Sequence, residues 1–210
     1  MRPIILIGAG GHCASCIEAI ESTGEWEITG LVDKQERIGA RLLGYEVMGN
    51  DSGLSELAQR FGAALITVGQ IESSTLRRRL FLAARSSGFE LPVITASTAR
   101  VSRYANIGYG TIVLHHAFVN AGAQVGENCI LNTGTIIEHD AVVGGNCHVS
   151  TGAIVNGDCI IGDGSFIGSG AVLRNGICLV AGCVVGAGAV VTKDLHEAGI
   201  YVGCPARRKE

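Results

Sequence analysis

The sequence is poor in proline, aromatic residues and charge. Its 210 residues include three prolines, 5% aromatic and 17% charged side chains, against 47% apolar ones. A disordered chain would be apolar-poor and charge-rich, so this composition excludes disorder. Few prolines and no Gly-X-Y period exclude collagen. No apolar run reaches the roughly 18 residues of a membrane helix, and the run at residues 4–7 is too short for a signal peptide. We therefore expect a cytoplasmic protein without a membrane partner.

The charge balance gives no sign of nucleic-acid binding. The formal net charge is −3 and the sequence pI is about 6.1, whereas a nucleic-acid site needs clustered Lys and Arg. Two short basic clusters occur, at residues 77–79 and 207–209. We interpret the first as the solvated face of a helix and the second as a frayed chain end.

The eight cysteines do not form the pattern of a disulfide framework. The chain is too long and apolar to need such staples, and nothing marks it as secreted. Cys13 and Cys16 form a C-x-x-C pair, which is a redox or metal motif in some proteins, but no second pair stands at zinc-site spacing. We expect buried thiols and no metal site.

Glycine, by contrast, is abundant, and it accompanies a repeat of six residues. Glycine makes up 31 of the 210 residues, about twice the usual share. An aliphatic residue recurs at every sixth position, sixteen times without a break: Val101, Ile107, Val113, Val119, Val125, Leu131, Ile137, Val143, Val149, Val155, Ile161, Ile167, Leu173, Leu179, Val185 and Val191. A period of six fits short strands separated by turns, with three strands in each coil of a solenoid.

Two further positions of the repeat support this interpretation. Four residues after each aliphatic residue stands a small one, except at Ile177 and Leu195. The residue just before each small one is Gly, Asn or Asp, except at Tyr104 and His116. Those three types tolerate the positive φ of a turn. The pattern predicts a parallel β-helix with aliphatic side chains stacked inward and small ones at its corners.

Residues 1–96 lack the repeat and alternate between strand and helix patterns. We expect strands at residues 4–7, 28–32, 65–68 and 91–94, and helices at residues 12–22 and 73–87. This alternation predicts a small parallel, Rossmann-like α/β sheet. The chain would then consist of an α/β domain (1–96), a β-helix domain (97–195) and a C-terminal tail (196–210).

The turn after the first expected strand carries part of a dinucleotide-binding motif. Gly8 and Gly10 match its first two glycines, Cys13 replaces the third, and Asp33 stands where an acid would meet a ribose. Free N–H groups at a helix start favour an anionic group even without the full motif. A purely structural glycine turn is one alternative. NAD is an alternative ligand, although residues 1–96 are too short for both halves of an NAD-binding fold.

The sequence resembles the bacterial nucleotide-sugar N-acetyltransferases of the hexapeptide-repeat family, the group of the pilin-glycosylation and sialic-acid-locus enzymes. The resemblance covers nearly the whole chain. It is carried by residues 7–12 (IGAGGH), 31–33 (LVD), 131–133 (LNT), 136–140 (IIEHD), 147–150 (CHVS) and 199–206 (GIYVGCPA). It implies a left-handed parallel β-helix, acetyl-CoA as co-substrate, and a homotrimer with active sites at the subunit interfaces.

By this resemblance His139 is the general base that takes a proton from an acceptor amine. Imidazole titrates near neutral pH, which suits the role, and a position two residues after the inward Ile137 points the ring out of the coil. Asp140 would orient the ring, with Glu138 as the alternative. The residues expected to bind the acceptor substrate are Gly10, Gly11, His12, Asp33, Asn132 and His148.

The resemblance also implies where the two substrates lie. Acetyl-CoA would occupy the outer groove between neighbouring β-helices, at Gly157, Ser169 and Ala187, with Pro205 near the adenine; Ala187 stands where glycine is usual. The acceptor would be a nucleotide-linked 4-amino-4,6-dideoxy sugar acetylated on its 4-amine. UDP is the first expectation for the nucleotide, with GDP and dTDP as alternatives.

Three other functions compete with this one. A sialic-acid-type sugar O-acetyltransferase would keep the fold and change the acceptor to a hydroxyl. A carbonic-anhydrase-like metal site needs three histidines, but His115, His139 and His148 are 24 and 9 residues apart, which does not match 18-residue coils. A non-catalytic scaffold would not need the intact Glu-His-Asp motif at residues 138–140.

Overall fold

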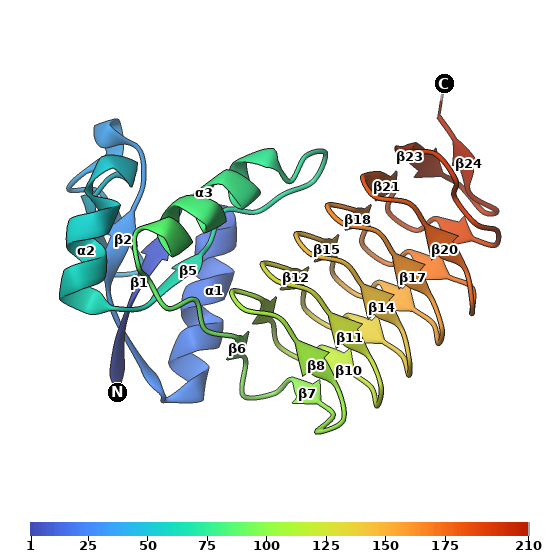
Figure 1. Cartoon of the computed structure of the whole chain (residues 1–210), viewed down its shortest axis with the longest axis horizontal. Coiled ribbons are helices and arrows are strands. Elements are labelled where there is room, and N and C mark those ends of the chain that lie inside the picture. The colour runs from blue at the N-terminus through green and yellow to red at the C-terminus, as the bar shows by residue number, and fades with distance from the viewer. Residues whose placement is uncertain (210) are drawn as a thin grey trace.

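An α/β domain precedes a long stack of short strands (Figure 1). The computed structural model describes residues 1–209. The α/β part contains β1 (Arg2–Ile7), α1 (Gly11–Thr23), β2 (Trp26–Val32), the 3-10 turn η1 (Gln35–Arg37), β3 (Arg41–Leu42), β4 (Tyr45–Gly49), the 3-10 turn η2 (Asp51–Gly53), α2 (Leu54–Phe61), β5 (Ala64–Ile66) and α3 (Thr75–Ser86).

The sheet of the α/β domain is buried on both faces. Its strand order is β3-β4-β2-β1-β5; β4, β2, β1 and β5 are parallel, and β3 pairs antiparallel with β4. Alternate residues of β1 point to opposite sides, so that Ile4 and Leu6 pack with α1 while Ile5 and Ile7 pack with α2 and α3. The predicted parallel α/β sheet is confirmed, but β3, β4 and α2 were not predicted.

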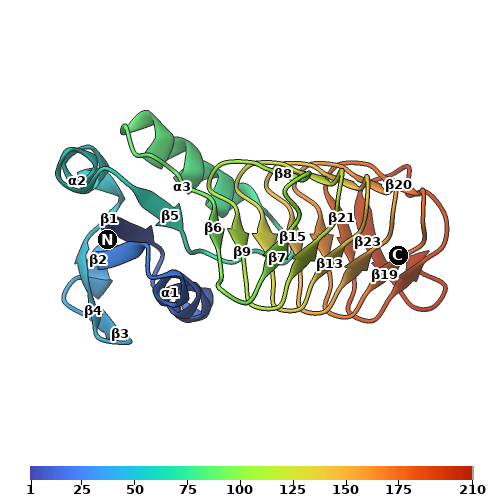
Figure 2. The same cartoon turned by 90° about the horizontal axis from the view of Figure 1, so that it is seen from below.

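The β-helix consists of three parallel sheets that run along the stack (Figure 2). The first sheet contains β6 (Ile94–Thr95), β9 (Ile112–Val113), β12 (Ile130–Leu131), β15 (His148–Val149), β18 (Phe166–Ile167), β21 (Cys183–Val185), β23 (Gly199–Val202) and β24 (Arg207–Arg208). The second contains β7 (Arg100–Val101), β10 (Phe118–Val119), β13 (Ile136–Ile137), β16 (Ile154–Val155), β19 (Val172–Leu173) and β22 (Val190–Val191). The third contains β8 (Asn106–Ile107), β11 (Gln124–Val125), β14 (Val142–Val143), β17 (Ile160–Ile161) and β20 (Cys178–Leu179).

Three lines of turns join these sheets, and we name them edges A, B and C. Edge A follows the first sheet, edge B the second and edge C the third. Edge A includes residues 96–98, 114–116, 132–134, 150–152, 168–170 and 186–188. Edge B includes residues 102–104, 120–122, 138–140, 156–158 and 174–176. Edge C includes residues 108–110, 126–128, 144–146, 162–164 and 180–182. Equivalent positions on one edge are therefore 18 residues apart.

The six-residue repeat has the structural meaning that the sequence predicted. The aliphatic and small positions from Val113 and Ala117 onward form one continuous buried core. Most turn positions adopt a positive φ, including Asp140 at 59°. His116 also has a φ of 59°, although it is neither Gly, Asn nor Asp. The hydrophobic stacking therefore continues through the whole solenoid.

Three expectations about individual segments were wrong. The strand expected at residues 91–94 does not join the α/β sheet, because Ile94 pairs with Ile112 in the first coil of the β-helix. Arg77 is not solvated but fully buried, while Arg78 and Arg79 are exposed. The basic chain end is not frayed, since Arg207 and Arg208 form β24 and pair with β23.

The two parts of the chain share one hydrophobic core. Residues of α1 and of the α/β sheet lie in the same buried cluster as Ile112, Leu114 and Ile130 of the β-helix. The guanidinium of Arg77 donates hydrogen bonds to the carbonyls of Ile66 and Asn128, at 2.6 and 3.1 Å, and so connects β5 with edge C. Within residues 1–209, no helix is both long and apolar enough to cross a bilayer.

Neighbouring residues of β17 provide a test of the inward stacking. Ile161 is 1% exposed and Ile160 is 49% exposed. Replacing a buried Ile with Ala leaves a cavity, so we expect Ile161→Ala to lower the free energy of unfolding by about 2–5 kcal/mol. Ile160→Ala is the matched control and should change it by no more than about 0.5 kcal/mol. Urea unfolding of both variants measures the difference, and equal losses would contradict the assigned register.

Candidate functional site

A cleft of about 870 Å³ lies between the α/β domain and edge A. We call it the acceptor cleft. It brings together four residues that the sequence singled out, namely Gly11, His12, Asn132 and His148. Its other wall is the segment after β5, residues 69–73, together with Leu76 of α3. Both domains therefore contribute to one cavity.

A chain of hydrogen bonds crosses the floor of the acceptor cleft. Nδ1 of His148 donates to the carbonyl of Gln70 at 2.7 Å, which leaves Nε2 as an acceptor for the amide of Asn132 at 3.1 Å. Oδ1 of Asn132 accepts the N–H of Thr133 at 2.8 Å. These bonds fix the tautomer of His148 and the orientation of the Asn132 amide, whose second N–H is free to meet a ligand.

The two histidines of the acceptor cleft are neutral at neutral pH. Burial, with the positive charge of Arg77 as a smaller cause, lowers the pKa of His12 to about 3 and that of His148 to about 4. The ring centroids lie 6.3 Å apart, and Nε2 of His12 is 3.4 Å from Sγ of Cys16. Glu72 is the one charged side chain among the residues that line this cleft. The part of the cavity beside these side chains therefore favours a neutral or cationic group over an anion.

The glycine loop leaves open space above the start of α1. Gly8 needs its glycine for a φ of 112° and because a Cβ there would lie 2.5 Å from the Val68 side chain. Gly10 and Gly11 have ordinary φ values, and a Cβ on either would meet no atom within 4 Å. A side chain would therefore fit at both positions, so the start of α1 is open to a ligand. Gly10 is also the N-cap of α1, where glycine is a favoured residue.

Asp33 organises the glycine loop from the carboxyl end of β2. Its Oδ2 accepts the N–H of Ala9 at 2.7 Å and contacts Arg37 at 3.2 Å, and its Oδ1 accepts the N–H of Lys34 at 2.7 Å. The side chain is 15% exposed. Asp33 therefore lines the neighbouring surface at the end of the sheet, but the acceptor cleft does not include it.

His139 and Asp140 project from edge B. Nδ1 of His139 lies 3.0 Å from Oδ2 of Asp140, and the histidine side chain is 52% exposed. The hydrogen bond to Asp140, followed by the negative charges of Asp140, Asp158 and Glu138, raises the pKa of His139 above its ordinary value. A carboxylate can only accept, so Nδ1 carries the proton and Nε2 is the ring nitrogen that can accept one.

The residues expected to contact acetyl-CoA lie on two edges and in the tail. Gly157 is one coil above His139 on edge B, where a Cβ would lie 2.6 Å from Cε1 of His139. Ser169 and Ala187 follow one another on edge A, where the carbonyl of Ser169 accepts the N–H of Gly188 at 2.9 Å. Pro205 is exposed, next to the buried Ala206. A single chain thus brings Gly157 to His139 but keeps Ser169 and Ala187 on another edge.

The acceptor cleft and His139 lie on different edges of the same chain. The edges of one coil are six residues apart, which an extended chain spans in up to about 20 Å. The lining of the acceptor cleft does not include His139 or Asp140. Sequence analysis also missed the wall at residues 69–73. Its place directly after a parallel strand was the available signal, because ligands bind at the carboxyl ends of such strands.

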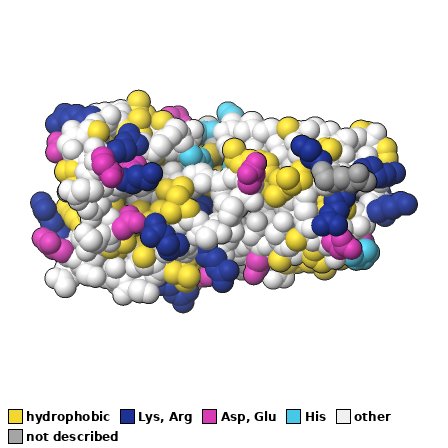
Figure 3. All heavy atoms as spheres, turned by 90° about the horizontal axis from the view of Figure 1, so that it is seen from above, with side chains coloured by type: hydrophobic (Ala, Val, Ile, Leu, Met, Phe, Trp, Pro, Cys, Tyr) yellow, Lys and Arg dark blue, Asp and Glu magenta, His cyan; other side chains and the backbone are white. Residues whose placement is uncertain are grey.

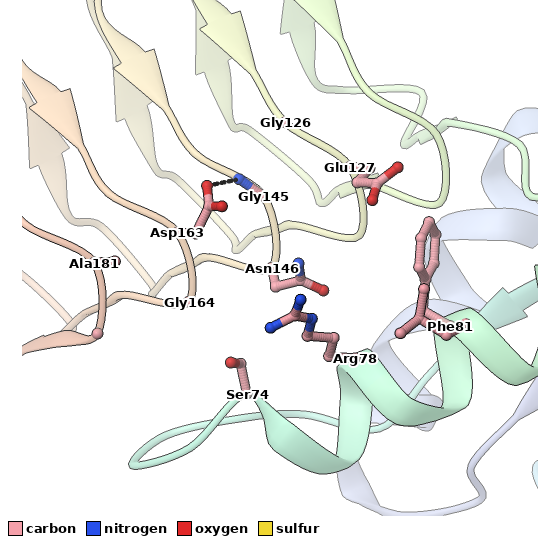
Figure 4. A pocket seen from close by; sticks show the side chains of 12 residues that line it. Ser74, Arg78, Phe81, Gly126, Glu127, Gly145, Asn146, Asp163, Gly164 and Ala181 are labelled. Atoms are coloured by element: carbon pink, nitrogen blue, oxygen red, sulfur yellow. Dashed lines mark hydrogen bonds between the residues drawn. The ribbon is translucent and has the colours of Figure 1, made fainter.

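A second groove of about 640 Å³ runs between α3 and edge C (Figure 4). Arg78 of α3 and Ser74, the N-cap of that helix, face Asn146 and Asp163 of the β-helix across it. It contains none of the residues that the sequence predicted to be catalytic or to bind a substrate. Among residues 1–209, no group of three or more His, Cys, Asp or Glu side chains is placed to hold a metal ion. Charged side chains gather over the α/β domain and at the C-terminal end (Figure 3).

Comparison with known families assigns both parts of the chain. Residues 3–81 match the PglD N-terminal domain, and residues 140–175 match the six-repeat bacterial transferase hexapeptide family. A comparison with curated proteins gave no match. The fold and the repeat thus define a hexapeptide-repeat transferase.

Solved structures narrow this class. The acetyltransferase domain of PglB from Neisseria gonorrhoeae, in complex with acetyl coenzyme A, is 31% identical over 99% of both chains, with a TM-score of 0.92. PerB from Caulobacter crescentus, in complex with CoA and GDP-perosamine, is 30% identical over 100% of this chain and 98% of that one, with a TM-score of 0.93. WeeI from Acinetobacter baumannii, at 22% identity and a TM-score of 0.83, shares the fold. The chain belongs to the PglD-type hexapeptide-repeat acetyltransferases, and its predicted left-handed β-helix fold is confirmed.

The buried histidines make the stability of the protein depend on pH. The pKa values of His12 and His148 are about 3 and 4 in the folded chain, against an ordinary value of 6.5. The unfolded chain therefore binds more protons below pH 6.5, and stability should fall as the pH falls, by up to about 1.4 kcal/mol per pH unit for each group. His148→Gln removes one such group, so its thermal midpoint should fall less between pH 7 and pH 5. His196→Gln, at an exposed histidine, should follow the wild type. An unchanged pH dependence in His148→Gln would contradict this assignment.

Proposed function

We propose that this chain transfers the acetyl group of acetyl-CoA to the 4-amine of a nucleotide-linked 4-amino-4,6-dideoxy sugar. The observation that carries the proposal is the exposed His139–Asp140 pair on edge B of a hexapeptide β-helix. Relatives support it, because PglB is solved with acetyl coenzyme A and PerB with CoA and GDP-perosamine. A variant of the latter enzyme with one histidine changed to asparagine is also known with both ligands.

The proposal divides the work between the domains. Residues 1–96 would bind the nucleotide at Gly10 and Gly11 and over Asp33, residues 97–195 would carry the chemistry, and the tail at 196–210 would complete the CoA site. The open space at both glycines supports this division, since N–H groups at a helix start attract a diphosphate. The sequence favoured UDP as the nucleotide of the acceptor. Because PerB binds a GDP-linked sugar, GDP is an equal candidate for this chain.

The acceptor amine would lie in the acceptor cleft, next to Asn132, His148 and His12. These side chains offer hydrogen bonds without positive charge, because burial holds the pKa of both histidines far below neutral. Glu72 adds the one negative charge of the lining. An amine that arrives partly protonated is attracted to such a cavity, whereas an extra cation would repel it.

His139 would remove one proton from the amine as the nitrogen attacks the thioester carbonyl. Nε2 accepts the proton, a C–N bond forms, the C–S bond breaks and the CoA thiolate leaves. Asp140 holds Nδ1–H and stabilises the positive charge that forms on the ring. Gly157, Ser169, Ala187 and Pro205 would hold CoA, mostly through main-chain groups, and the missing Cβ of Gly157 leaves the ring of His139 accessible.

The proposed reaction needs more than one copy of the chain. His139 and the acceptor cleft are separated by one side of the coil, so His139 of one copy would act on the substrate held by the next. A contact between two different edges repeats around a closed ring when the rotation closes. We propose a homotrimer, in keeping with the hexapeptide repeat, and a cytoplasmic location, where the eight cysteines stay as the free thiols observed.

Thiol release from acetyl-CoA, measured with a panel of UDP-, GDP- and dTDP-linked 4-amino sugars, tests the proposed reaction. We expect turnover on at least one of them and a loss of about 10²–10⁴-fold in His139→Ala, because the general base is removed. The exposed His196 provides the matched control, and His196→Ala should keep full activity. Turnover only on hydroxyl acceptors of the sialic-acid type would replace the proposed amine acceptor. Full activity in His139→Ala would remove the proposed base.

The pH dependence of the reaction tests the role of Asp140. Asp140 raises the pKa of His139, so kcat/KM should fall on the acid side as His139 becomes protonated. In Asp140→Asn that pKa drops, and we expect the acid limb of the profile to move to lower pH while kcat decreases. Asn tolerates the positive φ of this turn, so the backbone should be preserved.

Asp158→Asn is the matched control for this experiment. Asp158 has the same φ of 59° one coil above, and its carboxylate affects the pKa of His139 through its charge, without a side-chain hydrogen bond to the ring. The acid limb of the kcat/KM profile should shift less in Asp158→Asn than in Asp140→Asn. An acid limb that stays in place in Asp140→Asn would show that Asp140 does not set the pKa of the base.

A further inference from the structure

The acceptor cleft continues along edge A into another groove, between α1 and the first coils, which we call the α1 groove. It encloses about 810 Å³ between α1 and the first coils, and it shares Ser15 and Thr133 with the acceptor cleft. Its lining includes Glu18 of α1 and Ser97, Thr98, His115 and His116 of edge A. None of the proposed catalytic or binding residues lies in its lining.

The turn positions of the repeat contain two unexplained aromatic residues. Every turn position from residue 104 to residue 194 is Gly, Asn or Asp except Tyr104 on edge B and His116 on edge A. His116 has a φ of 59°, in the left-handed region that residues other than glycine seldom adopt, although histidine does so more often than most. Tyr104 is 63% exposed, and the guanidinium of Arg103 stacks on its ring at 4.7 Å. Both side chains are exposed in the single chain.

The coil spacing relates these two exceptions to the proposed active site. In the chain, His139 of edge B stands between Thr133 and Thr151, which line the acceptor cleft on edge A. Two coils below, 36 residues earlier, Arg103 stands between Ser97 and His115, which line the α1 groove. Rotation about an axis parallel to the stack keeps every height unchanged. If His139 meets the acceptor cleft of the next copy, Arg103 and Tyr104 must meet its α1 groove.

We propose that the α1 groove of one copy receives Arg103 and Tyr104 of the next copy in the ring. This inference rests on the proposed function in one respect, namely that His139 serves the acceptor cleft of a neighbouring copy. The ring of Tyr104 would pack against His116, and Arg103 would approach Glu18. A second copy of this chain is thus the occupant of the groove.

The charges on the two surfaces are complementary. The carboxylate of Glu18 is 66% exposed, and its Oε2 lies 2.6 Å from Nε2 of His115. Its other oxygen can still accept a hydrogen bond from a guanidinium. Nδ1 of His115 lies 2.7 Å from the hydroxyl of Thr98, so the imidazole is held on edge A beside Glu18. A positioned carboxylate facing an arginine that is already held on a tyrosine ring is a pre-organised contact.

Disulfide trapping between subunits tests the contact directly. Tyr104→Cys and His116→Cys are combined in a chain whose exposed Cys178 and Cys204 are changed to serine. The two positions lie on different edges of one chain, whereas a disulfide needs Cα atoms within about 7 Å, so only a second copy can supply the bond. With oxidised glutathione as oxidant, we expect linked dimers and trimers on a non-reducing gel.

The matched control uses another exposed tyrosine. Tyr109 lies on edge C and is 74% exposed, and Tyr109→Cys with His116→Cys should stay monomeric on the same gel. The proposal is supported if linked species form in the variant with Tyr104→Cys and His116→Cys and do not form in the Tyr109 control. Monomers only, or equal linking in the Tyr109 control, would overturn it.

Charge reversal provides a second, independent measurement. Arg103→Glu and Glu18→Arg should each raise the concentration at which the assembly half-dissociates by at least about tenfold, because like charges then meet at every interface of the ring. The double variant should restore assembly. Arg78→Glu, at an exposed arginine beside edge C, is the control without effect.

Both readouts are independent of catalysis. If subunits are linked by disulfides and the double charge variant restores assembly, but no acceptor is turned over, the docking proposal is supported and the proposed function is contradicted. Turnover without linking and without charge rescue would do the reverse.

Discussion

The stacking of identical coils is the constraint on which the rest of the structure depends. Each inward aliphatic side chain packs on the one 18 residues before it and the one 18 residues after it, as Val119, Ile137 and Val155 do. A slip of one residue would turn the aliphatic set outward, so the hydrophobic core holds the register. Positions on one edge consequently keep fixed heights. This is why Gly157 lies directly above His139, and why a larger side chain there would collide with the ring.

The junction between the domains adds a second wall to one edge of this regular solenoid and so forms the acceptor cleft. The α/β sheet and the first coils share one core, and Arg77 adds a buried link between β5 and edge C. Burial lowers the pKa of Arg77 to about 10, which leaves it charged at neutral pH. Its Nε and Nη1 donate to main-chain carbonyl oxygens rather than to a carboxylate, so it fixes the segment after β5 without a buried acid as its partner. The carbonyl of Gln70 can then hold His148, and through it Asn132.

The sequence predicted the features that depend on the six-residue repeat. It did not predict the features that depend on packing between segments far apart in the chain. The β-helix, its inward track and the outward ring of His139 follow from a period that sixteen positions obey. Strands β3 and β4 and the eight-residue helix α2 are short, so each offers few positions from which a period can be recognised. The strand at residues 91–94 was assigned to the wrong sheet because its partner Ile112 belongs to the repeat. Arg77 stands at helical spacing on the buried face of α3 with Leu80 and Phe81, but its charge favoured a solvated position. Residues 69–73 follow a parallel strand, yet nothing in their own pattern shows which part of the β-helix they face.

Burial divides the histidines into two kinds, and this division argues for the proposed roles. His12 and His148 are held neutral by desolvation, and the ring nitrogens of His148 are both engaged in hydrogen bonds. Such a ring positions a ligand, but protonating it would cost the desolvation that lowers its pKa. His139 differs in each respect: it is open to solvent, its Nε2 lone pair is free, and Asp140 favours its charged form. A base must accept a proton and then release it to water. His139 can do both, because Asp140 raises its affinity for the proton and its side chain is open to solvent. The same chain would thus bind its substrate with its buried histidines and move protons with an exposed one.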